Sequence, residues 1–338
     1  MLANILVIPG KIDLREIVEQ EPSYGEVLIK IKAALTCGTD LKAFKRGHPV
    51  IPMPGVFGHE FSGIVARVGR GVRKFKEGDE IMAVHSAPCL ECRYCRKRLY
   101  NLCANIMKTK VLGAFAEYIL LPSHIVKQNV FLKPKKISFE EAAFLEPLSC
   151  VVHGIESIRV KEKDNTLVIG AGPIGLLHLL LLKKKGARVT VMDKHGKKLR
   201  MAKDLGADYT VMATRENHNL KNVKDFLGFD HVFECTGIPE VWEDSVNYVS
   251  KGGTVVLFGG CKSGTKITYD AGRLHYDEIT IKGTFHFSPS DVKKAYSLLC
   301  EGRIAVSRLI SGRYPLRQTQ KAFDRLSKGI GIKYAIIP

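Results

Sequence analysis

The chain has 338 residues, of which 45% are hydrophobic and 25% are charged. This length and balance are typical of a globular protein with two domains, and they exclude collagen-like and disordered chains. The 52 Lys and Arg residues outnumber the 34 Asp and Glu residues, so the formal net charge is +18. Such a charge favours nucleic acid or phosphate-bearing small molecules as partners, and a lysine-rich surface that serves neither is the simpler interpretation.

The longest apolar stretch, residues 174–182, contains His178 and runs into three lysines. It is much shorter than the ~20 apolar residues of a membrane helix, so we expect no membrane partner. The N-terminus has no basic start and no small-residue cleavage site, which predicts a cytoplasmic protein without a signal peptide. The nine cysteines favour metal binding or free thiols over a disulfide framework. No stretch combines clustered Arg and Lys with regular aromatic residues, so no specific nucleic acid is expected.

The first 150 residues predict short strands separated by turns, with strands at residues 27–31 and 64–68. From residue 166 the pattern changes to alternating strands and helices. We predict a helix at 197–205 and strands at 166–169, 188–192, 230–234 and 254–258. This βαβ series indicates the α/β class with a doubly wound parallel sheet. The last 50 residues are predicted to be irregular.

Residues 168–175 read VIGAGPIG, a G-x-G-x-x-G pattern directly after a predicted strand and before a predicted helix. Gly170 allows the tight turn, Gly172 leaves room for a pyrophosphate, and Gly175 lets the helix pack close to the strand. The N–H groups at the start of the helix would face the phosphates. The pattern and its context therefore predict a dinucleotide site.

The next predicted strand is followed by Asp193, eighteen residues after Gly175. A carboxylate at this place accepts hydrogen bonds from the adenosine ribose and repels a 2′-phosphate. This favours NAD over NADP. Lys194, His195 and Lys198 are nearby cations that would offset part of the repulsion.

Four cysteines lie close together in a C-x2-C-x2-C-x7-C pattern within residues 89–103. Four thiolates saturate a tetrahedral Zn²⁺ and leave no open position, so the pattern predicts a structural zinc loop. Its ligands would be Cys89, Cys92, Cys95 and Cys103. A basic zinc knuckle for nucleic acid is the rival interpretation, and the spacing alone leaves an iron–sulfur cluster open.

Three other residues of metal-binding type lie far apart: Cys37, His59 and Glu146. Taken singly, such a cysteine or histidine belongs more often to the core, and such a glutamate to the surface. Their positions in the sequence do not show that they meet in the fold.

The chain resembles the zinc-dependent medium-chain alcohol and polyol dehydrogenases over essentially its whole length. Residues 58–63 carry the G-H-E-x-x-G signature of that family, and residues 68–79 carry its next motif. The four-cysteine loop and the Gly-rich turn then follow in the family's order. The resemblance implies a GroES-like, mostly β catalytic domain at residues 1–149 and 287–338, and a Rossmann coenzyme domain at 150–286.

This resemblance implies that Cys37, His59 and Glu146 bind a catalytic zinc, with water or substrate in the fourth position, so that each chain binds two zinc ions. The Glu-Pro-Leu context of Glu146 resembles the sorbitol, polyol and threonine dehydrogenase branches. Glu60 resembles the acid that binds the metal transiently or polarises its water in those branches. Asp40 resembles the acid that orients the histidine ligand.

The resemblance also implies that Thr39 passes on the hydroxyl proton, although it could simply cap a turn. Several family members have a histidine where this chain has Lys42. The proton would then leave through cofactor hydroxyls, water or His48. Cys150 would line the nicotinamide pocket or belong to the core, and His286 would border the substrate or lie on the surface.

By the same resemblance, we expect coenzyme contacts from the Gly-rich turn and from segments after later strands. The expected residues are Gly170, Gly172, Pro173, Ile174, Gly175, Asp193, Lys198, Phe258, Gly259, Thr284 and Phe285.

The implied reaction is hydride transfer from a secondary alcohol of a polyol, sugar or cyclitol to NAD. The metal favours loss of the hydroxyl proton, and the nicotinamide accepts the hydride. L-Threonine 3-dehydrogenase activity is the close alternative, and a non-catalytic nucleotide- or nucleic-acid-binding protein is the distant one. Family members form dimers or tetramers, so we expect a homo-oligomer, a homotetramer first.

Overall fold

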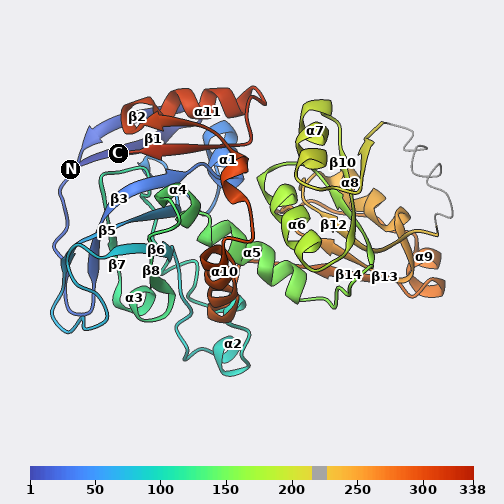
Figure 1. Ribbon diagram of the computed structural model, residues 1–338, viewed down its shortest axis with the longest axis horizontal. Coiled ribbons are helices and arrows are strands. Elements are labelled where there is room, and N and C mark those ends of the chain that lie inside the picture. The colour runs from blue at the N-terminus through green and yellow to red at the C-terminus, as the bar shows by residue number, and fades with distance from the viewer. Residues whose placement is uncertain (215–226) are drawn as a thin grey trace. The chain divides into compact units, whose positions relative to one another are not determined.

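The protein is described by a computed structural model that covers residues 1–214 and 227–338 (Figure 1). The chain divides into two compact units, residues 1–150 together with 286–338, and residues 151–285. These limits lie within one residue of the division expected from the sequence.

The first unit contains two sheets, one of strand order β2-β1-β4 and one of order β15-β16-β3-β5-β6-β8, in which β7 also pairs with β3. In the middle of β3, Ile29 and Ile31 are buried while Lys30 and Lys32 are exposed, which is the alternation of a strand with one face on a core. The strands are β1 (Leu2–Ile8), β2 (Lys11–Glu16), β3 (Val27–Leu35), β4 (Gly55–Val56), β5 (Glu60–Val68), β6 (Glu80–Val84), β7 (Tyr118–Leu121), β8 (Val130–Leu132), β15 (Ile310–Pro315) and β16 (Lys333–Ile337).

Short helices connect these strands. Helix α1 begins directly after Cys37, whose Sγ accepts a hydrogen bond from the Thr39 N–H at 3.5 Å and so caps the helix. The helices are α1 (Gly38–Arg46), α2 (Arg93–Arg96), α3 (Ser123–Asn129), α4 (Phe139–Ala142), α10 (Pro289–Glu301), α11 (Thr319–Ser327), and α5 (Leu145–Glu156), which has residues in both units.

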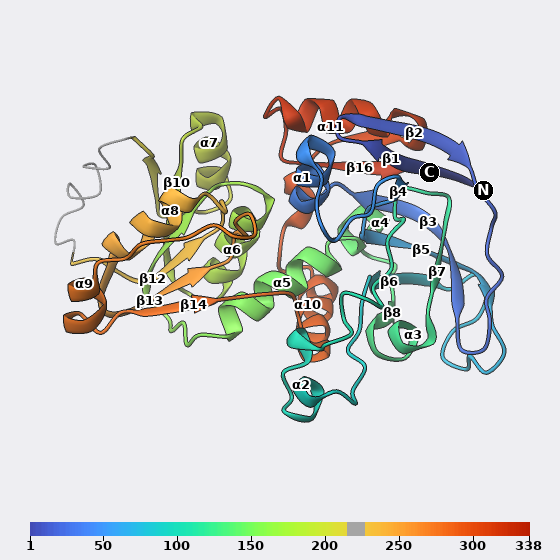
Figure 2. The same ribbon diagram turned by 180° about the vertical axis from the view of Figure 1, so that it is seen from behind.

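The prediction that the last 50 residues are irregular was wrong, because they contain α10, α11, β15 and β16. Helix α10 has a local start signal, a capping box between Ser288 and Asp291 with Pro289 in its first turn, and it ends at the left-handed Gly302. The two strands are defined by distant partners, since β16 pairs with β3. The chain ends lie side by side in both views (Figures 1 and 2), and Leu2 and Pro338 line one pocket.

The second unit is built on a six-stranded parallel sheet of order β11-β10-β9-β12-β13-β14, which confirms the doubly wound fold. The chain passes from β9 outward to β11, then returns to β12 beside β9 and continues to the other edge. The switch point therefore lies between β9 and β12, where open α/β sheets bind ligands. The strands are β9 (Asn165–Ile169), β10 (Arg188–Asp193), β11 (Tyr209–Met212), β12 (Phe229–Glu234), β13 (Val249–Leu257) and β14 (Thr280–Gly283).

Helices pack on this sheet, and α6 and α7 contact the strands β9, β10 and β11 (Figure 1). Seven of the twelve residues of α6 are buried, including His178, so the helix is apolar on most of its circumference. The helices are α6 (Pro173–Lys184), α7 (Gly196–Asp204), α8 (Pro239–Asp244) and α9 (Ala271–Tyr276). Within residues 1–214 and 227–338, no helix has both the length and the apolar character needed to cross a bilayer.

Candidate metal and dinucleotide sites

The four cysteines of the 89–103 loop meet in space, with their sulfur atoms all within 4.8 Å of one another. Cys103 Sγ lies 3.5 Å from Cys89 Sγ and 3.9 Å from Cys92 Sγ. A tetrahedral zinc with Zn–S bonds of ~2.3 Å places its sulfurs ~3.8 Å apart, so the cluster has the size that the metal needs. The sulfur of Cys103 also accepts N–H hydrogen bonds from Cys89 at 3.3 Å and Asn105 at 3.4 Å.

The backbone around this loop favours the thiolate form at two of the four cysteines, whereas burial raises the pKa of Cys95 to about 12. Hydrogen bonds from the N–H groups of Cys95 and Ala104 lower the pKa of Cys92 to about 6. Those of Glu91 and Cys92 lower the pKa of Cys89. Zinc binds the deprotonated sulfur, so the donor set fits a structural metal.

A second group forms where β3 ends and β5 begins. Leu35 of β3 is paired with Glu60 of β5 in the antiparallel ladder. Cys37 follows β3 and His59 precedes Glu60, so both reach the same edge of the sheet. The ligand atoms of Cys37, His59 and Glu60 lie within 4.8 Å of one another.

The histidine of this group is held by a buried acid. Asp40 is fully buried, and its Oδ1 lies 3.3 Å from Nδ1 of His59. This leaves Nε2 as the nitrogen available to a metal. Burial disfavours the charged imidazole, but Asp40 and Cys37 outweigh burial and hold the pKa of His59 well above its usual value. The site therefore favours a positive charge, which a metal ion supplies.

Glu60 is fully buried and is held by a lysine that sequence reasoning missed. The Lys333 ammonium donates to Glu60 Oε2 and also to the Thr36 carbonyl at 2.7 Å. Burial raises the pKa of Glu60, and Lys333 opposes this. Its other oxygen, Oε1, has no hydrogen-bond partner among the described residues. A buried, unpartnered carboxylate oxygen beside a thiol and an imidazole fits a metal ligand.

Glu146 lies in a neighbouring group, with its carboxylate, His85 and His286 within 4.8 Å of one another. His85 Nδ1 is 3.6 Å from Glu146 Oε1, and the rings of His85 and His59 are 5.0 Å apart, so the two groups adjoin. Burial raises the pKa of Glu146 to about 7. The geometry thus gathers Cys37 and His59 with Glu60, and the role of Glu146 as third ligand stays a prediction.

The two residues predicted to border the substrate are Cys150 and His286. Cys150 contacts Glu146, and the His286 ring lies beside that of His85. The Cys150 thiol donates to Glu146 Oε1 at 3.7 Å, and burial raises its pKa. His286 Nε2 lies 2.6 Å from the Ser86 hydroxyl, and its ring is 5.4 Å from that of His85. Sequence reasoning missed His85, although it directly follows the apolar strand β6 and lies four residues before Cys89.

Of the two proton-relay candidates, Thr39 lies in the first turn of α1 and His48 follows the end of that helix. Thr39 contacts Cys37 through its backbone N–H, as the turn-capping interpretation expects, and this contact does not test the relay. His48 Nδ1 accepts from the Val50 N–H at 3.4 Å. Burial lowers the pKa of His48, and nearby cations lower it further.

In the second unit the Gly-rich turn follows β9. Gly170 has a left-handed φ of 101°, and a Cβ on Gly175 would lie 1.8 Å from the Gly170 carbonyl oxygen, so the helix approaches too closely for any side chain there. A Cβ on Gly172 would meet no atom within 4 Å, so this side of the turn is open. The helix start and the open turn fit a pyrophosphate.

Asp193 closes the same turn. Its Oδ2 accepts from the Ala171 N–H and its Oδ1 from the His195 N–H, both at 2.8 Å. The carboxylate is thereby fixed at the carboxyl end of β10, as the sequence predicts.

The remaining coenzyme candidates mostly follow carboxyl ends of strands. Phe258 and Gly259 come after β13, and Thr284 and Phe285 come after β14. The Thr284 hydroxyl is buried without a partner among the described residues, which leaves it available to a ligand. Lys198 lies in the first turn of α7 instead, where its N–H donates to the His195 carbonyl at 3.0 Å.

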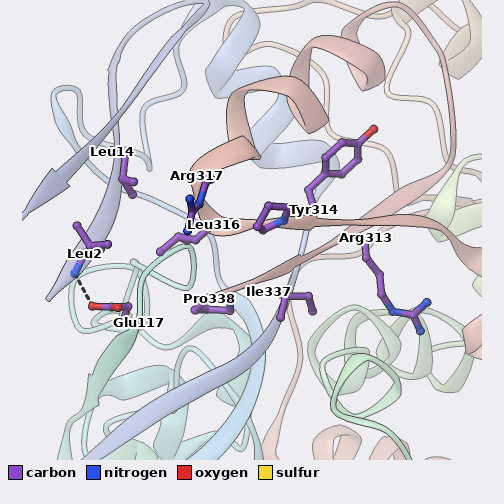
Figure 3. Close-up of a pocket in the computed structure, with 10 residues that line it drawn as sticks. Leu2, Leu14, Glu117, Arg313, Tyr314, Leu316, Arg317, Ile337 and Pro338 are labelled. Atoms are coloured by element: carbon purple, nitrogen blue, oxygen red, sulfur yellow. Dashed lines mark hydrogen bonds between the residues drawn. The ribbon is translucent and has the colours of Figure 1, made fainter.

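A surface pocket of about 560 Å³ in the first unit lies apart from these groups (Figure 3). It contains the hydrogen bond from the Leu2 N–H to Glu117 at 2.7 Å. Its lining comprises Leu2, Leu14, Glu117, Arg313, Tyr314, Pro315, Leu316, Arg317, Ile337 and Pro338. None of these is a residue that the sequence predicts for metal, coenzyme or substrate.

Comparison with known families gives two matches, which together include parts of both units. Residues 23–131 match the alcohol dehydrogenase GroES-like domain, and residues 173–301 match the zinc-binding dehydrogenase domain.

Curated relatives align over nearly the whole chain. D-arabitol-phosphate dehydrogenase of Enterococcus avium is 33% identical, over 94% of this chain and 91% of the relative. Sorbitol dehydrogenase of Bos taurus is 32% identical, over 97% and 93%. L-threonine 3-dehydrogenase of Alteromonas mediterranea is 31% identical, over 94% and 93%. Among solved structures, a zinc-binding dehydrogenase of Sinorhizobium meliloti bound to NADP has a TM-score of 0.89 at 31% identity, over 100% of this chain and 99% of that chain.

Proposed function

Since the chain belongs to the zinc-dependent medium-chain alcohol and polyol dehydrogenases, we propose that it oxidises a secondary alcohol of a polyol, sugar or cyclitol with NAD as hydride acceptor. The observation that carries the proposal is the buried group of Cys37, His59 and Glu60 beside Glu146. The names of the sorbitol and arabitol-phosphate relatives support a polyhydroxylated substrate.

We propose two metal positions per chain, the four-cysteine loop and the group around Cys37. When bound at Cys37 and His59, Zn²⁺ would supply the Lewis acidity that eases loss of the substrate's hydroxyl proton. Asp40 fixes the orientation of His59. Lys333 compensates the charge of Glu60. Glu60 and the neighbouring Glu146 are the two carboxylates that can serve as the third protein ligand of this zinc.

The proton would leave from the substrate hydroxyl through Thr39. His48 is the next candidate acceptor, because the cations around it favour its neutral, proton-accepting form. His286 and Cys150 would border the substrate, since they contact Ser86 and Glu146 respectively.

NAD is proposed as the preferred coenzyme over NADP because the fixed carboxylate of Asp193 would repel a 2′-phosphate. The coenzyme would contact the Gly-rich turn and the segments after β13 and β14. In the reaction, the chain's role is to bind and orient the nicotinamide, which takes the hydride.

A substrate panel tests the proposal. Sugar alcohols, cyclitols and L-threonine, each offered with NAD and with NADP to the zinc-loaded protein, should show the highest kcat/KM for a polyol with NAD. Preference for threonine would favour the second candidate, which the threonine dehydrogenase relative supports. No oxidation of any alcohol, together with a shift of random DNA in a gel at physiological salt, would favour the non-catalytic alternative.

We also propose that the protein is cytoplasmic and forms a homo-oligomer. All nine cysteines are free thiols, which suits a reducing compartment such as the cytoplasm. A homotetramer or dimer is proposed on the family resemblance, and light scattering of the purified protein measures the mass of the assembly.

A further inference from the structure

Four basic side chains gather beside the candidate catalytic metal group in the first unit. We call them the cationic rim: Lys42, Arg46, His48 and Lys110. Burial and the charges of Lys42, Lys110 and Arg46 lower the pKa of His48, which places all three cations within electrostatic reach of one imidazole. The charge of Asp40 also reaches His48 and Lys110 and offsets part of the positive charge of the rim. The remaining positive charge attracts an anion.

Two residues of the rim, Lys42 and Arg46, belong to helix α1, which begins next to a residue of the metal group. The helix begins directly after Cys37 and carries Asp40, which contacts His59. Lys42 and Arg46 are four residues apart on the same helix, so both lie on one face. Arg46 is exposed and Lys42 is half-buried.

Lys110 lies between the rest of the rim and the group of His85, Glu146 and His286. Its ammonium donates to the Val50 carbonyl at 2.5 Å, in the turn that carries His48. The next residue, Val111, donates its N–H to the His85 carbonyl at 2.8 Å. Lys110 therefore lies between the His48 turn and the strand end where His85 meets Glu146.

Each acid around the metal group has a closer basic partner than Arg46 or Lys110. Asp40 lies against His59, Glu60 accepts from Lys333, and Glu146 lies against His85. Within residues 1–214 and 227–338, neither Arg46 nor Lys110 forms an ion pair with a carboxylate. Their charge is therefore available to an anion from outside the protein.

We propose that the cationic rim binds the phosphate of a phosphorylated polyol, so that the substrate is a phosphate monoester rather than a free polyol. The inference rests on the proposed function and adds the substrate's charge. Lys and Arg form short, charge-assisted hydrogen bonds with phosphate oxygens. The coenzyme's phosphates are the other source of the same chemistry, but the Gly-rich turn of the second unit provides for those.

The first test compares kcat/KM for a polyol and for its terminal monophosphate, using sorbitol and D-arabitol as parents. The phosphorylated partner should be the better substrate. Lys110→Met and Arg46→Met should each lower its kcat/KM by about 10- to 100-fold, the loss of one charge-assisted contact, and lower that of the free polyol far less. Lys110→Arg, which keeps the charge, should restore most of the preference.

Lys45→Met is the matched control. Lys45 lies on the same helix, but its ammonium donates to the Ser327 carbonyl at 3.1 Å. The variant removes the same charge and should leave the ratio of the two kcat/KM values unchanged. A higher kcat/KM for free polyols, equal losses on both substrates, or a rise confined to the KM of NAD would each overturn the inference.

A binding measurement separates this inference from the proposed function. Inorganic phosphate is titrated calorimetrically into zinc-loaded, coenzyme-free protein. The unmodified protein should bind it, the Lys110→Met variant should bind it at least about tenfold more weakly, and binding should weaken with added salt. Equal binding by both proteins would contradict the rim. Failure to oxidise any polyol or polyol phosphate would overturn the proposed function, whatever the titration shows.

Discussion

Lys333 and Glu60 form an ion pair in which both side chains are about 1% exposed. Two charges removed from water are stable only if each is satisfied, and Lys333 achieves this through Glu60 and the Thr36 carbonyl. The pair joins the last strand of the chain to the start of β5. Lys333 is therefore a positioning residue for Glu60.

Lys333→Met should destabilise the protein by about 3–5 kcal/mol, because the Glu60 carboxylate would be buried without its partner. Urea unfolding measures this loss. Lys333→Arg should recover part of it by keeping the charge. A Lys333→Met variant as stable as the parent would show that Glu60 does not depend on the pair.

Asp193→Gly should raise the ratio of kcat/KM for NADP to that for NAD by about tenfold, equivalent to about 1.4 kcal/mol of lost repulsion and ribose binding. Asp193→Asn is the matched comparison, since it removes the charge and keeps one of the two acceptor oxygens that bind the Ala171 and His195 N–H groups. Steady-state kinetics with both coenzymes gives the ratio. An unchanged ratio in Asp193→Gly would remove the proposed role of this carboxylate in coenzyme choice.

Among the elements, those with local signals were predicted well. β9 was expected at 166–169 and spans 165–169, β10 was expected at 188–192 and spans 188–193, and the helix expected at 197–205 spans 196–204. Continuous apolar runs and a Gly-rich turn mark such elements without help from tertiary contacts. β16 lacks such marks, because its place depends on pairing with β3, and α10 was missed although its capping residues could have identified it.

Helix α6 contains a buried histidine with a measurable consequence. His178 is fully buried, its Nδ1 lies 2.9 Å from the Ile174 carbonyl, and burial lowers its pKa from 6.5 to about 4. Because the unfolded chain binds the proton more readily, the stabilising contribution of neutral His178 is present above pH ~6.5 and is lost as the pH falls toward 4, about 3 kcal/mol in all.

His178→Leu should therefore reduce the loss of unfolding free energy between pH 7 and pH 4.5, because leucine takes up no proton. Urea unfolding of both proteins at the two pH values measures the difference, and changes elsewhere in the protein affect both equally. Parallel pH dependence of the two proteins would refute the assignment to His178.

At the scale of the whole molecule, the sequence indicates which residues bear chemistry but not which of them meet. The cysteine loop was predictable because its ligands are local. The second metal group depends on the β3–β5 ladder, so Cys37 and His59 were identified through family motifs rather than by proximity. His85, Lys110 and Lys333 follow only from the fold, because their partners lie on distant segments.

The cysteine loop should contribute to stability rather than to chemistry. Cys92→Ser should lower the Tm by about 5–10 °C, since three ligands hold zinc less tightly than four. Differential scanning calorimetry measures this. Cys300→Ser, at a cysteine of α10 outside both metal groups, is the control for loss of a thiol. Equal melting of the Cys92→Ser variant and the parent would argue against a metal in the loop.

A zinc ion at Cys37 and His59 that activates the alcohol is central to the proposed function. The measurement that tests this directly is the zinc content of purified Cys37→Ser beside its turnover of the preferred polyol. The unmodified protein should contain about two zinc ions per chain and the variant about one, with turnover reduced by at least about 1,000-fold and an unchanged circular dichroism spectrum. A folded variant that retains about two zinc ions, or that still oxidises the alcohol, would contradict the account.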